Sequence, residues 1–121
     1  MISDILNGGV KMRIRKKEVA VDSLTAAELE LVTKVSDALA HPARLELYRY
    51  IMTENRRMNK VCTKDLVSAF DYAQATVSQH MKVLVRSGLV DVKNEERFAY
   101  YYANLGVLMK YTDAVKKYTI V

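Results

Sequence analysis

The chain has 121 residues, which is enough for one compact domain and too few for two. Half of its residues are hydrophobic and only one is proline, so the composition indicates a globular protein and argues against a disordered chain. The net charge of +5, from 19 basic and 14 acidic residues, suits a polyanionic partner but does not prove one.

Residues 1–22 show no clear hydrophobic period, and we predict a separate arm here, ahead of a folded domain over residues 23–121. Its 11–17 run alternates apolar and basic residues for a few positions, and one interpretation is an arm that is frayed or loosely docked. Residues 1–10 lack the features of a secretory signal, and no segment approaches the ~20 apolar residues that cross a bilayer. A cytoplasmic protein is therefore expected.

Two helices are predicted next. Thr25 and Glu28 have the spacing of a capping box, and the apolar residues that follow recur at helical spacing, which predicts a helix over residues 25–39. Pro42 suits the first position of a second helix, because its missing N–H would be unpaired there in any case. This helix is predicted to run to about Glu54 with a buried stripe of Leu45, Tyr48, Ile51 and Met52.

A short third helix is predicted to start at Thr63, whose hydroxyl can cap it, with Asp65 favoured near the positive helix N-terminus. Its expected inner face is Leu66, Ala69 and Phe70. A turn over residues 71–73 leads to a fourth helix that runs to about Ser87, where Gly88 is a natural stop.

The fourth helix has two chemically different faces at about 100° per residue. Its apolar side, which should face the core, consists of Val77, Met81, Leu84 and Val85. The opposite side consists of Ala75, Thr76, Gln79, Lys82, Val83 and Arg86. Such a face is either simply solvated or able to read bases, since glutamine can pair bidentately with adenine, and cations further along the helix suit phosphate.

A β-hairpin with a polar tip follows. Val90 and Val92 alternate with polar residues, residues 94–97 interrupt, and residues 98–103 form the second strand. A last helix is predicted from Leu105 to about Thr119, with the apolar stripe Val107, Leu108, Tyr111, Ala114, Val115 and Tyr118.

Several segments in this order resemble the ArsR/SmtB family of bacterial winged-helix repressors. They read ALAHPARLEL at 38–47, VCTKDL at 61–66, QATVSQHMKVL at 74–84, SGLV at 87–90 and RFAYYY at 97–102. The resemblance covers roughly residues 24–120. It implies a mainly α winged helix-turn-helix fold of order α-α-α-α-β-β-α with a small β-hairpin. It also implies a homodimer that places one recognition helix per subunit in successive major grooves, and repression that an inducer relieves.

The resemblance and the helix faces together give two sets of site residues. The candidate DNA contacts are Gln74, Ala75, Thr76, Ser78, Gln79, His80, Lys82 and Arg86 of the fourth helix, with Lys64, Lys93 and Arg97. The candidate dimer contacts, on the first and last helices, are Leu31, Val35, Val107, Leu108, Tyr111, Val115 and Tyr118. The N-terminal arm would then touch DNA phosphate or pack across the dimer.

The chain departs from the family's metal sensors, which often carry two cysteines in the third helix or an Asp/His/Glu set on the last. Lys64 stands where the second thiolate would be, and Asp113 is the only carboxylate of a last helix that has no histidine. We therefore expect no metal site and no cofactor. Cys62 is interpreted as a small core residue, with a lone redox-sensing thiol, or a disulfide to Cys62 of the partner subunit, as the alternatives.

Three further hypotheses concern the turn, His80 and the β-hairpin, which corresponds to the wing of the family. Asp71 is expected to tolerate a left-handed backbone or to cap the fourth helix together with Gln74. His80 is expected to bond to backbone or phosphate rather than to a metal. Acidic residues at the wing tip should weaken its contact with phosphate, and the outer row of Phe98, Tyr100 and Tyr102 is either a cross-strand packing set or a surface covered by the arm or a ligand.

The resulting prediction is a sequence-specific DNA-binding transcriptional regulator, a repressor released by an unidentified signal, that binds a pseudo-palindromic double-stranded operator. The inducer would be a small molecule or a redox signal, with no inducer at all as the third alternative, and no membrane is involved. The alternative is a winged-helix module that binds protein instead of DNA. An enzyme is not expected, because no catalytic constellation and no Gly-rich phosphate loop stands out.

Overall fold

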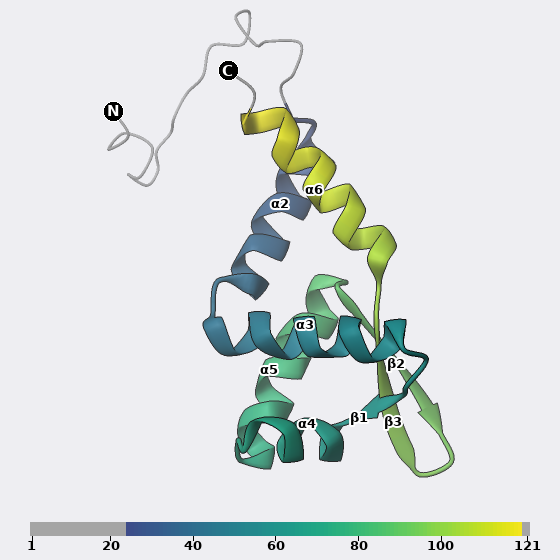
Figure 1. The fold of residues 1–121 in the computed structure, drawn as a ribbon. Helices are drawn as coiled ribbons and strands as arrows, with labels where there is room; N and C mark the ends of the chain where they lie inside the picture. Colours follow the sequence, from purple (N-terminus) through teal and green to yellow (C-terminus); the bar gives the residue numbers. More distant parts are fainter. Residues whose placement is uncertain (1–23, 120–121) are drawn as a thin grey trace, which may run out of the picture.

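The computed structural model describes residues 24–119, so the predictions for residues 1–22 lie outside its range. In chain order the elements are α2 (Ala26–Leu39), α3 (Pro42–Arg56), β1 (Val61–Cys62), α4 (Thr63–Phe70), α5 (Gln74–Ser87), β2 (Val90–Glu95), β3 (Phe98–Ala103) and α6 (Leu105–Thr119) (Figure 1). The predicted winged-helix order is confirmed, with one additional short strand. None of the described helices is long and apolar enough to span a membrane.

Side-chain caps set the starts of the two long outer helices. The Thr25 hydroxyl accepts from the Glu28 N–H at 3.1 Å, and the Glu28 carboxylate accepts from the Thr25 N–H at 2.9 Å. This confirms the predicted capping box. At the start of α6, Asn104 Oδ1 accepts from the Val107 N–H at 3.1 Å, a cap that the sequence analysis did not identify.

The buried face of α3 differs from the prediction. Leu47, Tyr48 and Ile51 are almost completely buried, whereas Leu45 is 42% exposed. Two residues correspond to about 200° around a helix, so Leu45 and Leu47 lie on nearly opposite sides. The choice of Leu45 as a core residue was therefore wrong, and Leu47 takes that place.

The start of α4 also differs from the prediction. Its N-cap residue is Cys62, and Asp65 Oδ2 accepts from the Cys62 N–H at 2.9 Å and from its thiol at 3.3 Å. Thr63 does not cap the helix, because its hydroxyl instead bonds to the Tyr101 hydroxyl at 3.0 Å. Ala69 is exposed, so its assignment to the inner face was wrong.

Of the two roles predicted for Asp71, a left-handed backbone and a cap for the helix that follows, the structure shows only the first. Asp71 has φ 58° and ψ 34°, a left-handed conformation that ends α4, as its residue type allows. The N-cap residue of α5 is Ala73, and no side chain caps that helix. The hypothesis that Asp71 caps α5 was therefore wrong.

The sheet has three antiparallel strands in the order β1-β3-β2. β1 was not predicted, because two residues are too short to show an alternating pattern. It pairs Val61 with Tyr101, while β2 pairs Val92 with that same Tyr101 on its other side. β2 extends to Glu95, and the hairpin turns tightly at Glu96, which has φ 60°.

Figure 1 shows two layers. In one, α3 and α5 pack with α4 and the sheet around a core that includes Leu47, Tyr48, Ile51, Leu66, Val77, Met81, Leu84, Leu89 and Val90. In the other, α6 packs on α2 and extends beyond this core. The contact between α2 and α6 includes a hydrogen bond between the Ser36 and Tyr111 hydroxyls at 2.9 Å and an ion pair between Lys117 and Glu28 at 2.8 Å.

Candidate nucleic-acid interface

The buried side of α5 fixes the orientation of its other side. Val77, Met81 and Leu84 are at most 1% exposed, which holds the helix against α2, α3 and α4. Val85, which was expected on the same side, is half-buried. The helix ends at Gly88, whose φ of 92° is a conformation that side chains rarely adopt. α5 is therefore a rigid element, and the chain leaves it directly into β2.

The opposite face of α5 is exposed and has no acidic residue. Its exposed side chains are Gln74, Ala75, Thr76, Gln79, Lys82 and Arg86, with Ser78 and Val83 half-buried. No side chain caps the helix, so the N–H groups of its first turn, which point along the helix axis, have no side-chain acceptor. A helix N-terminus and two cations on one surface create a positive potential that favours a polyanion.

His80 lies at the edge of this face and turns toward α3. Its ring is 4.7 Å from that of His41, and burial, followed by the charges of His41 and Arg44, lowers the pKa of His80 below its usual 6.5. His80 is therefore neutral at pH 7. Arg44 itself donates to the carbonyl oxygen of Ala38 at 2.7 Å and so ties the start of α3 to the end of α2. Arg44 was not among the predicted site residues.

The aromatic row of the wing is partly covered by lysine side chains. Lys60 Nζ lies 5.1 Å from the centre of the Tyr100 ring, and Lys93 Nζ lies 5.5 Å from that of Tyr102. Both tyrosines are half-buried, and Phe98 is 42% exposed. These contacts favour the cross-strand packing interpretation of the row.

The charges at the wing tip are partly compensated. Lys60 donates to Glu95 at 2.6 Å, and this hydrogen bond is the main reason why the pKa of Lys60 is raised. Arg97 is exposed beside the exposed Glu96 at the turn. Lys60 was not among the predicted site residues, because its partner lies 35 residues away in the sequence.

Two predicted residues near the start of α4 differ in exposure. Lys64 is exposed in the first turn of α4. Cys62 is buried, as expected of a core residue. Among residues 24–119, no three His, Cys, Asp or Glu side chains are close enough together to hold a metal ion.

The residues predicted to form a dimer contact differ in how much of their surface is exposed. Val35 is completely buried inside the protomer, so it has no surface left for another chain. Tyr118 is 55% exposed, and the others, Leu31, Val107, Leu108, Tyr111 and Val115, are half-buried. Leu29 of α2 and Leu105 and Met109 of α6, which were not among the predicted residues, are each more than half exposed.

Comparison with known proteins agrees with this geometry. A family model described as a helix-turn-helix domain matches residues 39–93. The arsenical resistance operon repressor of Bacillus subtilis (strain 168) is 34% identical over 67 residues, a match that covers 55% of this chain and 60% of that repressor. The uncharacterized HTH-type transcriptional regulator YbzH of the same organism is 25% identical over 93 residues, covering 69% of this chain and 93% of that protein.

One solved structure, an ArsR-like transcriptional regulator from Rhodococcus sp. RHA1, superposes with a TM-score of 0.67 at 19% identity, covering 78% of this chain and 84% of that one. The fold, the turn between α4 and α5 and the β2–β3 wing define a winged helix-turn-helix protein. Within that class, the chain is similar to the arsenical resistance operon repressor of Bacillus subtilis, of which it spans 60%.

Proposed function

We propose that this protein is a sequence-specific DNA-binding transcriptional regulator that acts as a homodimeric repressor. The observation that carries the proposal is the exposed face of α5. It combines Thr76 and Gln79, which can read bases, with Lys82 and Arg86, and it contains no carboxylate. The buried side of α5 fixes the direction of this face, as a reader of the major groove requires.

The side chains divide into base readers and phosphate contacts. Gln79 is suited to pair with adenine, and Thr76 can bond to several bases. Lys82 and Arg86, about one and two turns after Gln79 along α5, are suited to contact phosphates. The uncapped N-terminus of the helix is suited to the same contact. Lys64 on α4 and Lys93 and Arg97 on the wing are further exposed cations that we assign to phosphate. His80, which is neutral and packed on His41, is better suited to fixing α5 on α3 than to pairing with phosphate.

The exposed apolar residues of α2 and α6 support a homodimer. Leu29 and Tyr118 are each 55% exposed on these two helices, which extend beyond the core layer. Apolar side chains that stay exposed on these two helices suit a second copy of the same surface. A two-fold dimer with one α5 per subunit predicts a pseudo-palindromic operator with half-sites about 10 bp apart or a multiple of that.

Substitution of Gln79 tests the proposal. The Gln79→Ala protein should bind a duplex selected from a random library about 5 to 150 times more weakly, because a good bidentate pair contributes ~1–3 kcal/mol of discrimination. Binding to a scrambled duplex should be unchanged, since phosphate contacts carry no sequence information. Fluorescence anisotropy at one fixed salt concentration measures both affinities.

Lys110→Ala, on the exposed surface of α6, is the matched control and should leave both affinities unchanged. If the native protein itself shows no preference between the selected and scrambled duplexes, the proposal is wrong. A winged-helix module that binds protein would then be the better account.

A further inference from the structure

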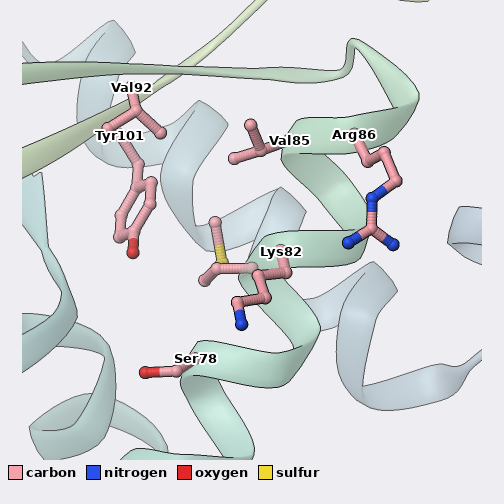
Figure 2. A pocket seen from close by; sticks show the side chains of 7 residues that line it. Ser78, Lys82, Val85, Arg86, Val92 and Tyr101 are labelled. Carbon is pink, nitrogen blue, oxygen red and sulfur yellow. The ribbon is translucent and has the colours of Figure 1, made fainter.

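A groove of about 560 Å³ lies between α5 and the inner face of the wing (Figure 2). Met81 and Val85 of α5 form one apolar wall, and Val92 of β2 with the ring of Tyr101 of β3 forms the other. Its volume is within the range of ~300–1,000 Å³ that is usual for small-molecule sites. The mechanism of DNA recognition makes no use of these apolar walls.

The apolar walls are a consequence of strand register. Val92 and Tyr101 are directly paired across β2 and β3, so both side chains project from the same side of the sheet, toward α5. Tyr101 is 9% exposed, and its hydroxyl is held by Thr63 at 3.0 Å. Val92, however, is still 38% exposed, and Val85 is only half-buried. The wing and α5 therefore do not close on each other, and branched apolar side chains line the space between them.

The edge of the groove is cationic. Ser78, Lys82 and Arg86 follow one another along α5 at intervals of four residues, so they line one side of the groove (Figure 2). Neither Lys82 nor Arg86 has a carboxylate within 4.0 Å among the residues that the structure describes. An apolar space with two unpaired cations at its edge is complementary to a molecule with an apolar body and an anionic end.

We propose that this groove binds a small apolar carboxylate, and that its occupation and DNA binding exclude each other. The inference rests on the proposed function, because Lys82 and Arg86 are the phosphate contacts assigned above. A carboxylate paired with these cations withdraws them from DNA, and an apolar body between α5 and the wing occupies space next to the DNA-facing surface. Coupling between two ligands is reciprocal, so DNA must lower the affinity for the carboxylate by the same factor.

Decanoate, with decan-1-ol as its uncharged counterpart, is the probe. Titration calorimetry on the full chain should show saturable decanoate binding, and decan-1-ol should bind at least tenfold more weakly. Lys82→Gln should reduce decanoate affinity about tenfold and remove most of the difference in affinity between the two probes, whereas Lys110→Gln on α6 should change neither.

The apolar walls are tested by the double substitution Val85→Thr and Val92→Thr, which keeps the shapes of both side chains. It should also weaken decanoate binding about tenfold. Because neither valine is among the DNA contacts, this variant should bind the selected duplex as the native protein does.

Competition is measured by adding decanoate to the complex with the selected duplex. The inference predicts release from DNA in the native protein, and release at about tenfold higher decanoate in the double valine variant. It is overturned if decanoate does not bind up to about 1 mM, if decan-1-ol binds equally well, or if decanoate binds without releasing DNA. Calorimetry needs no DNA, so decanoate binding to a protein that shows no sequence preference would refute the proposed function while leaving the carboxylate site in place.

Discussion

The hydroxyl of Tyr48 is a buried polar group in the centre of the core. The residue is 1% exposed, its hydroxyl has no hydrogen-bond partner among the described residues, and burial raises its pKa to about 12. An unpaired buried hydroxyl contributes a desolvation penalty and no compensating bond. Tyr48→Phe should therefore leave the free energy of unfolding unchanged or raise it by up to about 1 kcal/mol in urea denaturation.

Tyr111→Phe is the matched control, because it removes a hydroxyl that does have a partner, Ser36 at 2.9 Å. It should lower the free energy of unfolding by about 0.5–1.5 kcal/mol. A loss of more than 1 kcal/mol in Tyr48→Phe would show that its hydroxyl is paired after all.

His80 should make the stability depend on pH. Its pKa is lower in the folded protein than the unperturbed 6.5, mainly through burial and then through His41 and Arg44. Between the two pKa values the unfolded chain binds more protons, so the contribution of His80 to stability is complete above about pH 6.5 and is lost as the pH falls toward the folded pKa. Urea denaturation between pH 5 and 7.5 should show this decline, and His80→Gln should reduce it.

The same assignment can be checked by NMR titration. His41→Gln removes one of the charges that lower the pKa of His80, so that pKa should rise in this variant. An unchanged His80 pKa, or an equal pH slope in the native and His80→Gln proteins, would contradict the packing described for the two rings.

At the scale of elements, α3 ends in a regular hydrogen-bond pattern, but one residue of that pattern has an unfavourable backbone conformation. The N–H groups of Met58 and Asn59 donate to the carbonyl oxygens of Asn55 and Glu54, both at 2.9 Å, which is the Schellman pattern. Its left-handed position usually holds glycine, but here it holds Met58, with φ 68° and 88% exposure. Met58→Gly should relieve this strain and raise the free energy of unfolding by about 0.5–1 kcal/mol in thermal or urea denaturation.

The neighbouring Arg57→Gly provides the control, since Arg57 has φ −88° and gains nothing from glycine. It should destabilise the protein by a similar amount through the added freedom of the unfolded chain. If both substitutions are destabilising, the left-handed position of Met58 is not strained.

The elements that local chemistry defines were predictable from the sequence. The Thr25–Glu28 capping box and Gly88 fixed the start of α2 and the end of α5, because a cap and a left-handed glycine are readable within a few residues. The elements that depend on distant partners were not. β1 exists only because Val61 pairs with Tyr101, and the choice between Leu45 and Leu47 depends on which side of α3 meets α5 and the sheet.

In the candidate site, too, the features set by local sequence were predictable and those set by distant partners were not. The faces of α5 follow from helix geometry, so the exposure of Thr76, Gln79, Lys82 and Arg86 was predictable, whereas Val83 and Val85 are both half-buried. The contacts of Lys60 with Glu95, of Arg44 with the end of α2 and of His80 with His41 join residues that are 6 to 39 positions apart. No local pattern identifies such pairs, and the groove between α5 and the wing depends on a strand register that only the folded chain defines.

For the whole molecule, the arrangement of charges sets how binding should respond to salt. The proposed function assigns five exposed cations to DNA phosphate, namely Lys64, Lys82, Arg86, Lys93 and Arg97, so a dimer would make up to about ten phosphate contacts. Each contact releases counterions, and the logarithm of the affinity falls with the logarithm of salt concentration by ~0.9 per contact. The affinity should therefore fall by about a thousandfold or more between 50 and 200 mM salt.

The most direct test of the central claim is the affinity for a selected pseudo-palindromic duplex and for its scrambled counterpart, measured by anisotropy at 50 and 200 mM salt. The account predicts two chains per selected duplex, a preference of at least about a thousandfold over the scrambled one, and the steep salt dependence for both. Equal affinity for the two duplexes, or binding that does not change with salt, would contradict the assignment of α5 as a DNA-reading helix.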